Sequence, residues 1–189
     1  MARTVLQQAD IARALTRISH EILESNRGPD DLVILGIPTR GVLLAERIGD
    51  TIRRIDPGAA GTLVGSLDTT MYRDDLSRNP TRAPARTSLP RGIDGATVVL
   101  VDDVLFSGRT IRAALDALSD LGRPRAVRLA VLVDRGHREL PIRADFVGKN
   151  LPSAYDERIN VRLAELDGED AVTIESGASD AQPMPGEEH

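Results

Sequence analysis

The 189-residue sequence contains no cysteine and no tryptophan, and only two phenylalanines and two tyrosines. Without cysteine, a disulfide framework and a zinc–thiolate site are both excluded, and a reducing cytoplasm is the expected location. With 2% aromatic residues, extensive base stacking on a nucleic-acid surface is excluded as well. No stretch of about eighteen apolar residues is present, so neither a membrane span nor a membrane partner is expected.

No single sign of charge dominates the chain. The formal net charge of -5 argues against a wholly basic nucleic-acid binder, and DNA is not expected as a partner. A local basic patch can still hold an RNA against an acidic remainder. The apolar content of 41% predicts one well-packed domain over residues 1–175. Residues 176–189 are rich in glycine, proline and acidic residues, which predicts a disordered tail.

Apolar periodicity predicts strands that alternate with helices. The expected helices are residues 10–24, 42–55 and 111–121, and the expected strands are residues 32–37, 62–70, 97–101 and 126–133. Short loops join most of these elements, which favours an α/β fold with a doubly wound, mainly parallel sheet flanked by helices. Ligands of such folds bind beyond the carboxyl ends of the strands, so the loops at Pro38 and Asp102 should share that edge.

Two segments do not fit this alternation. Residues 71–94 are crowded with Arg, Pro, Ser and Thr and show no sustained apolar period, which predicts a long flexible loop with a function. Residues 134–166 contain shorter strand-like pieces, at 144–147 and 161–166. We expect these pieces to form a small hood over the site.

The sharpest motif is residues 98–110, VVLVDDVLFSGRT, an apolar strand followed by two acids and a turn of small residues that opens a helix. Backbone N–H groups at a first helical turn attract phosphate, and Gly108 lets a phosphate approach closely. Asp102 and Asp103 are suited to accept hydrogen bonds from ribose hydroxyls and to stabilise a developing oxocarbenium ion. The alternative is that both acids only cap the helix. Neither a Walker A lysine nor a GxGxxG turn is present, which disfavours nucleoside-triphosphate hydrolysis and dinucleotide binding.

This motif resembles the signature of the type I phosphoribosyltransferases, and the resemblance implies their fold, phosphoribosyl pyrophosphate (PRPP) as substrate and Mg²⁺ as cofactor. It implies Asp102, Asp103 and Arg73 as catalytic residues. It places the 5'-phosphate of PRPP on Phe106, Ser107, Gly108, Arg109 and Thr110.

Residues 36–41, GIPTRG, are similar to the pyrophosphate loop of the same family, which often contains a cis peptide. The resemblance implies that Thr39, Arg40 and Gly41 bind pyrophosphate, and an arginine suits bidentate anion binding. An ordinary turn between a strand and a helix is the alternative. Residues 71–94 resemble the mobile catalytic loop of the family, whose closure would exclude water from the site.

A longer resemblance, to the PyrR family of pyrimidine-operon regulators, covers nearly all of the chain except the tail. Its phrases are ALTRISHE at residues 14–21, YRDDL at 72–76 and VDRGHRELPIRADFVGKN at 133–150. It implies uracil phosphoribosyltransferase activity, which converts uracil and PRPP to UMP and pyrophosphate. It also implies repression of the pathway through binding of pyrimidine-operon mRNA in the presence of UMP or UTP, and a homodimer or larger assembly.

The same resemblance implies two further groups of site residues. The base-binding group is Asp134, Arg138, Val147 and Lys149. The RNA-binding group is Thr16, Arg17, His20, Thr39, His137 and Arg143. Arg13, Arg17 and His20 give one helix a polar stripe, although a solvated face explains this equally well. The two histidines of the RNA group also suit ordinary surface positions. The sequence departs from the family at residues 78–86 and at Phe106, where a tyrosine is expected.

Two other functions stay open at this point. A purine phosphoribosyltransferase would use the same PRPP machinery, because base specificity depends on the hood. Activity with hypoxanthine or guanine but not uracil would select it. An RNA-binding regulator with vestigial catalysis would instead show nucleotide-stimulated RNA affinity without turnover.

Overall fold

The computed structural model describes residues 2–59, 63–74 and 85–177. The middle of the predicted flexible loop, residues 75–84, and the predicted tail from residue 178 lie outside this described part. Within it, no helix combines the length and the apolar character needed to cross a membrane.

A five-stranded parallel sheet forms the centre of the fold. In spatial order its strands are β3 (Val64–Ser66), β2 (Leu32–Gly36), β4 (Thr97–Leu105), β5 (Ala126–Asp134) and β6 (Phe146–Asn150). Every neighbouring pair is parallel. The central strands are buried on both faces, which explains their uninterrupted apolar sequences. The predicted doubly wound α/β fold is confirmed.

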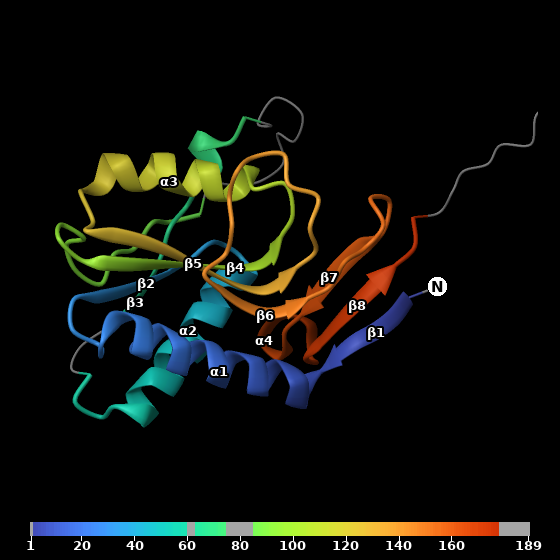
Figure 1. Ribbon diagram of the computed structural model, residues 1–189, viewed down its shortest axis with the longest axis horizontal. Coiled ribbons are helices and arrows are strands. Elements are labelled where there is room, and N and C mark those ends of the chain that lie inside the picture. The colour runs from blue at the N-terminus through green and yellow to red at the C-terminus, as the bar shows by residue number, and fades with distance from the viewer. Residues whose placement is uncertain (1, 60–62, 75–84, 178–189) are drawn as a thin grey trace, which may run out of the picture.

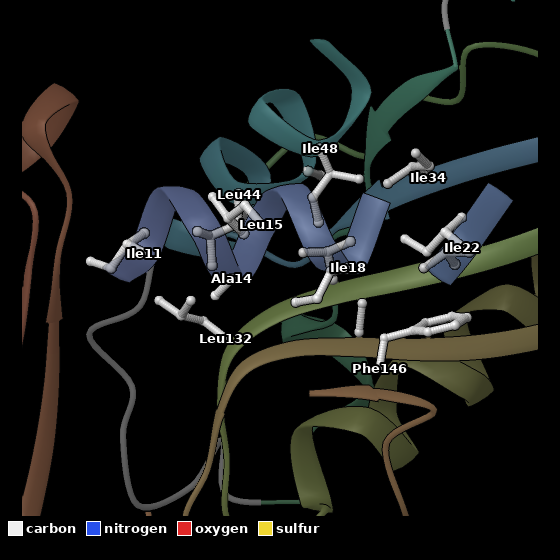
Figure 2. Packing of buried hydrophobic residues seen from close by; sticks show 14 of the residues in the cluster. Ile11, Ala14, Leu15, Ile18, Ile22, Ile34, Leu44, Ile48, Leu132 and Phe146 are labelled. Carbon is white, nitrogen blue, oxygen red and sulfur yellow. The ribbon is translucent and has the colours of Figure 1, made fainter. Parts of the chain in front are cut away.

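Helices cover both faces of this sheet. Helices α1 (Gln8–Asn26) and α2 (Arg40–Ile55) lie on one face and α3 (Arg109–Leu121) lies on the other (Figure 1). Figure 2 shows the first layer, in which apolar side chains that recur at helical spacing along α1 point toward α2 and the sheet. A second cluster joins α3 to the opposite side of the strands. The core therefore has two apolar layers with the sheet between them.

A smaller antiparallel sheet lies beside the main one, in the order β1 (Ala2–Gln7), β8 (Ala171–Glu175) and β7 (Arg158–Arg162). The short helix α4 (Ala164–Asp167) connects β7 to β8. The hood expected within residues 134–166 contributes only β7 and the start of α4 to this smaller sheet, and we use the name hood for β1, β7, α4 and β8 together. The predicted elements did not include β1, because most of its side chains are exposed and its sequence shows little apolar alternation.

Four predicted elements were wrong in extent or place. The strand predicted at 97–101 continues to Leu105, so Asp102 and Asp103 lie within β4 and not after it. The piece at 144–147 belongs to β6, which pairs with β5 in the main sheet because Phe146 packs into the layer under α1. The strand predicted at 161–166 ends at Arg162 and is followed by α4. The strand predicted at 62–70 is limited to β3, since the Asp68 carboxylate accepts hydrogen bonds from the Thr70 N–H (3.0 Å) and hydroxyl (2.6 Å) and begins a 3₁₀ turn, Thr70–Tyr72.

Candidate active site

The loop that follows β2 lies against β4 near the carboxyl edge of the main sheet. The Ile37 N–H donates a hydrogen bond to the Val101 carbonyl oxygen at 2.9 Å. A Cβ atom on Gly41 would lie only 2.4 Å from the same oxygen, so glycine is required where α2 begins against β4. The Pro38–Thr39 peptide is cis, as the resemblance implied. The shared edge expected from the sequence is therefore present.

The loop between β4 and α3 has the geometry of a phosphate cradle. Gly108 precedes the first residue of α3 with φ of 91°, a left-handed conformation that favours glycine. It has no side chain with which to cap the helix, so N–H groups of the first turn are available to a ligand. The Ser107 carbonyl oxygen accepts hydrogen bonds from the N–H groups of Glu139 (3.0 Å) and Leu140 (3.2 Å). These bonds fix the loop from the side of the β5–β6 connection.

A cavity of about 220 Å³ lies at this loop. Its lining residues are Arg73, Asp74, Asp102, Val104, Leu105, Phe106, Ser107, Gly108, Arg109, Thr110 and Ile111. Asp102 and Asp103 are both half-buried. The Asp103 carboxylate accepts from the Val104 N–H at 2.8 Å, a bond within its own strand rather than to α3. One cavity thus brings together the phosphate loop, one of the two acids and Arg73.

Arg109 uses its side chain to hold the cradle together. Its guanidinium donates to Glu139 at 2.6 Å and to Asp74 at 2.7 Å, and these two carboxylates raise the pKa of Arg109 above its ordinary value. The side chain is therefore occupied by carboxylates. Its backbone N–H donates a long hydrogen bond, of 3.3 Å, to the Ser107 hydroxyl oxygen within the same loop.

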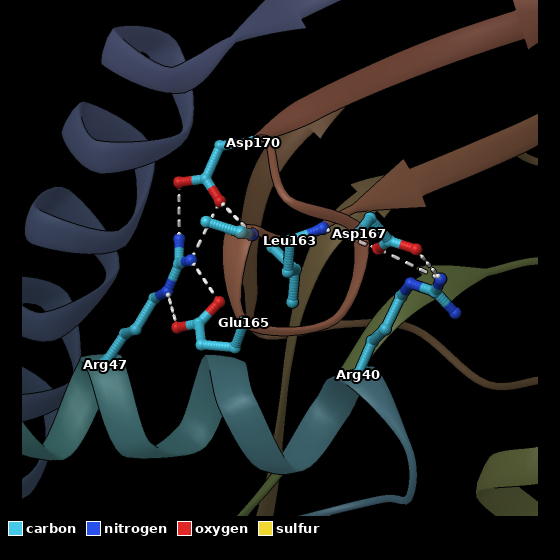
Figure 3. Close-up of polar contacts among 7 residues, drawn as sticks. Arg40, Arg47, Leu163, Glu165, Asp167 and Asp170 are labelled. Atoms are coloured by element: carbon cyan, nitrogen blue, oxygen red, sulfur yellow. Dashed lines mark hydrogen bonds and ion pairs between the residues drawn. The ribbon is translucent and has the colours of Figure 1, made fainter.

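Arg40, the arginine of the predicted pyrophosphate loop, contacts the hood. Its guanidinium donates two hydrogen bonds, of 2.9 and 3.1 Å, to the Asp167 carboxylate (Figure 3). The pKa of Asp167 is lowered, first by a hydrogen bond from the Leu163 N–H and then by Arg40. This partner was not predicted. In this structure Arg40 connects the loop to α4.

Arg47 makes a second link from α2 to the hood, two helical turns after Arg40. It donates to Glu165 at 2.9 and 2.6 Å and to Asp170 at 2.8 Å through two nitrogens (Figure 3). These bonds raise the pKa of Arg47 and lower the pKa values of both carboxyls. We call the five residues the hood clamp: Arg40, Arg47, Glu165, Asp167 and Asp170. The sequence signal that could have predicted this clamp is a pair of arginines seven residues apart, on one face of α2, together with the acidic residues within 165–170.

Comparison with known proteins agrees with this geometry. Residues 1–164 match the phosphoribosyl transferase domain family. A protein of Leifsonia xyli subsp. xyli named bifunctional protein PyrR is 79% identical over 182 residues, which cover 95% of this chain and 100% of that protein. The chain belongs to the PyrR family of phosphoribosyltransferases. The phosphoribosyltransferase class of the family therefore applies to this chain.

More distant relatives agree as well. The bifunctional protein PyrR of Streptomyces coelicolor is 66% identical over 96% of this chain and 93% of that protein. The crystal structure of a hypoxanthine-guanine phosphoribosyltransferase from Bacillus anthracis superposes with a TM-score of 0.68 at 18% identity, over 90% of this chain and 96% of that one. At this low identity the superposition shows the shared fold alone.

The four predicted base-binding residues lie on β5, on the segment that follows it and on β6, and none lines the active-site cavity. Arg138 is ion-paired with Asp134 at 2.5 Å and donates to the carbonyl oxygens of Ile142 (2.8 Å) and Phe106 (3.0 Å). These two residues therefore brace the phosphate loop. Val147 accepts a hydrogen bond from Arg17 through its carbonyl oxygen, and Lys149 is exposed.

A group of rings beside the phosphate loop was not predicted. Phe106, His137 and Tyr155 have ring centroids 5.6 to 6.1 Å apart in tilted or edge-on contacts. The guanidinium of the buried Arg135 lies 4.2 Å from the centroid of the Phe106 ring, a cation–π contact. Tyr155 is 67% exposed, so its ring is accessible to a ligand. The contact among the three rings could not be predicted, because Tyr155 belongs to none of the recognised phrases.

The predicted RNA-binding residues lie on three separate elements. Thr16, Arg17 and His20 are exposed on α1. Arg17 donates to the carbonyl oxygens of Val147 (3.0 Å) and Gly148 (2.7 Å) and so covers part of the edge strand β6. The other three residues are exposed: Thr39 precedes α2, and His137 and Arg143 lie between β5 and β6.

Proposed function

We propose that the chain transfers the phosphoribosyl group of PRPP to uracil at the carboxyl-edge cavity, and forms UMP and pyrophosphate. The observation that carries the proposal is that Asp102 and the Gly108 cradle line the same cavity. Backbone N–H groups of residues 106–110 bind the 5'-phosphate. The two acids accept hydrogen bonds from the ribose hydroxyls, and Arg73 with the loop at residues 39–41 binds pyrophosphate.

The reaction is a substitution at C1' of the ribose. The bond from C1' to the pyrophosphate oxygen breaks, and its electron pair leaves with pyrophosphate. Uracil N1 forms the new bond to C1' and releases its proton to solvent water. Positive charge develops on the ribose ring during this exchange, and the half-buried carboxylates of Asp102 and Asp103 stabilise it where surrounding protein weakens solvent screening.

The two acids also fit Mg²⁺. This ion prefers oxygen ligands and is usually held by one or two carboxylates together with substrate phosphates. Among the described residues no group of three or more His, Cys, Asp or Glu side chains could hold a metal ion. We propose that Mg²⁺ binds together with PRPP, and that the carboxylate of Asp102, which lines the cavity, would help to hold it. The bound ion would neutralise charge on the departing pyrophosphate.

The choice of base separates uracil transfer from the purine alternative. The test is to measure product formation from PRPP with uracil, hypoxanthine and guanine in turn, each with magnesium. We expect UMP formation with uracil and none with either purine. IMP or GMP formation without UMP would assign the chain to purine chemistry on the same fold.

We also propose that the chain binds pyrimidine-operon mRNA when UMP or UTP is bound, through the exposed face of α1. His20→Ala should weaken RNA binding and leave UMP formation unchanged. Arg17→Ala separates the two activities less well, because Arg17 also donates to the carbonyl oxygens of Gly148 and of Val147, a predicted base-binding residue. Arg123→Ala, at an exposed position after α3 and away from the α1 face, is the control and should leave RNA binding unchanged. If His20→Ala lowers both activities, or neither, the RNA surface is placed wrongly; RNA affinity without turnover would favour a purely regulatory protein.

The family also supports a homodimer or larger assembly and a cytoplasmic location, and the lack of cysteine agrees with the latter. Analytical ultracentrifugation of the full chain tests the assembly. A single species at the mass of two or more chains is expected, and a monomer at working concentration would contradict it.

A further inference from the structure

A second cavity lies at the opposite edge of the main sheet, where β4 and β5 begin. Its volume of about 350 Å³ falls in the range of small-molecule sites, roughly 300–1,000 Å³. Thr97 and Ala126, the first residues of these strands, line it together with the last turn of α1. It shares no lining residue with the active-site cavity. The length of β4, roughly 25–30 Å, separates the two. We call it the amino-edge cavity.

Three arginines line the amino-edge cavity: Arg27 from the end of α1, and Arg125 and Arg128 from the start of β5. Among the described residues that line it there is no aspartate or glutamate. Arg125 donates to the Thr97 hydroxyl at 3.0 Å, a neutral partner. Arg128 is 3.3 Å from the Asp145 carboxylate in a partly exposed pair, which neutralises it weakly. The cavity thus concentrates positive charge in a chain whose net charge is -5.

The remaining walls of the cavity are polar in part, at Ser25, Asn26 and Thr97, and apolar at its base. Ile22, Leu32, Val99 and Phe146 line it and are buried. The C-terminal dipole of α1 opposes an anion here, but a helix dipole contributes less than one charge-assisted hydrogen bond from a guanidinium. Two carbonyl oxygens of the last turn, those of Leu23 and Glu24, accept hydrogen bonds from the N–H groups of residues 28 and 27. A cationic rim over an apolar floor suits a phosphorylated ligand with an apolar or planar part.

We propose that the amino-edge cavity is a second anion site, which binds a small organic phosphate of the nucleotide class. The site is independent of the proposed catalysis, because it uses different residues at the other end of the sheet. Its occupant would contact α1, the helix whose exposed face is proposed to bind RNA. A ligand bound there is thus placed to affect RNA binding.

The test counts the UMP molecules bound per chain by isothermal titration calorimetry. For the wild type we expect two: one at the active site and one at the amino-edge cavity. Arg125→Gln/Arg128→Gln should bind one, with the second site weakened at least about tenfold for each guanidinium that is lost. Arg123→Gln removes a neighbouring exposed arginine that does not line the cavity, and it should still bind two. UMP formation should be unchanged in both variants.

Three outcomes would overturn the proposal. One is a single UMP per chain in both the wild type and the double variant. Another is an equal loss in Arg123→Gln, which would indicate a general charge effect. The third is loss of RNA affinity in the double variant with unchanged UMP stoichiometry, which would make the cavity an RNA contact. Failure of the proposed catalytic site alone would look different, with one UMP in the wild type and none in the double variant. If the double variant does not fold, Arg128→Gln alone repeats the test.

Discussion

At the scale of single residues, the phosphate cradle depends on Gly108. Its φ of 91° is unfavourable for a residue with a Cβ atom, and that atom would lie 3.3 Å from Ile142 Cβ. Gly108→Ala must therefore shift the loop or the segment at 139–142. We expect the KM for PRPP to rise about tenfold, which corresponds to about 1.4 kcal/mol of lost phosphate binding. Steady-state kinetics with varied PRPP measure this change.

The matched control is Gly92→Ala. Gly92 is exposed, and a Cβ atom there would meet nothing within 4 Å. Its KM for PRPP should equal that of the wild type. Equal KM values for Gly108→Ala and the wild type would show that the loop at 106–110 does not hold the phosphate.

Arg138 is a second residue whose role can be tested separately. Its guanidinium joins Asp134, Ile142 and Phe106, three points around the cradle, and it lines neither cavity. Arg138→Lys keeps the charge but cannot make all three contacts, because an ammonium lacks the planar fork. We expect the KM for PRPP to rise, although the net charge of the chain is unchanged. An unchanged KM for PRPP would rule out the bracing role.

At the scale of elements, the hood clamp holds α4 against α2. The Asp170 side chain is 7% exposed, so removing Arg47 leaves a nearly buried carboxylate without its cation. Loss of one partner of a fully buried pair costs about 3–5 kcal/mol, and the exposed position of Glu165 reduces this. We expect Arg47→Gln to destabilise the fold by about 2 kcal/mol, or about 4–8 °C in Tm. Arg53→Gln, in an exposed pair on the same helix, should change stability by less than about 0.5 kcal/mol. Equal Tm values for the two variants would contradict the clamp.

The clamp also predicts a dependence on pH. Arg47 lowers the pKa values of Glu165 and Asp170 below their ordinary values of 4.5 and 3.8. A carboxyl with a lowered pKa in the folded state contributes stability above its unfolded pKa, and this is lost as the pH falls through the folded value. The Tm difference between wild type and Arg47→Gln should thus be full at pH 7 and shrink below about pH 4. Thermal melts from pH 7 to pH 3 measure it, and a difference independent of pH would contradict the assignment.

Elements of the main sheet could be predicted from the sequence, because their apolar runs and helical periods are local signals. The strand β1 and the division between β6 and the hood could not. A short strand has the same alternation whether it joins one sheet or another, and its partner is decided by long-range packing, here of Phe146 under α1. The turn at Asp68 likewise ends β3 through a side-chain hydrogen bond that apolar patterning does not reveal.

At the scale of the whole molecule, the parallel order of the strands creates the site. The loops after β2 and β4 lie at one edge because both strands run in the same direction, and this consequence of topology was predictable from the alternation of elements. The ion pairs of Arg40 and Arg109 were not predictable, since they join residues far apart in the sequence. These ion pairs engage the side chains of Arg40 and Arg109, which the motifs alone assign to pyrophosphate and to phosphate.

Asp102 and Asp103 at this edge are proposed to support transfer of the phosphoribosyl group to uracil. The most direct test is the rate of UMP formation from uracil, PRPP and magnesium by the wild type and by Asp102→Asn/Asp103→Asn, a nearly isosteric variant without the two charges. Loss of charge stabilisation in the transition state should lower kcat at least about a hundredfold, with the Tm changed little. A double variant that forms UMP at the wild-type rate would show that the chemistry takes place elsewhere.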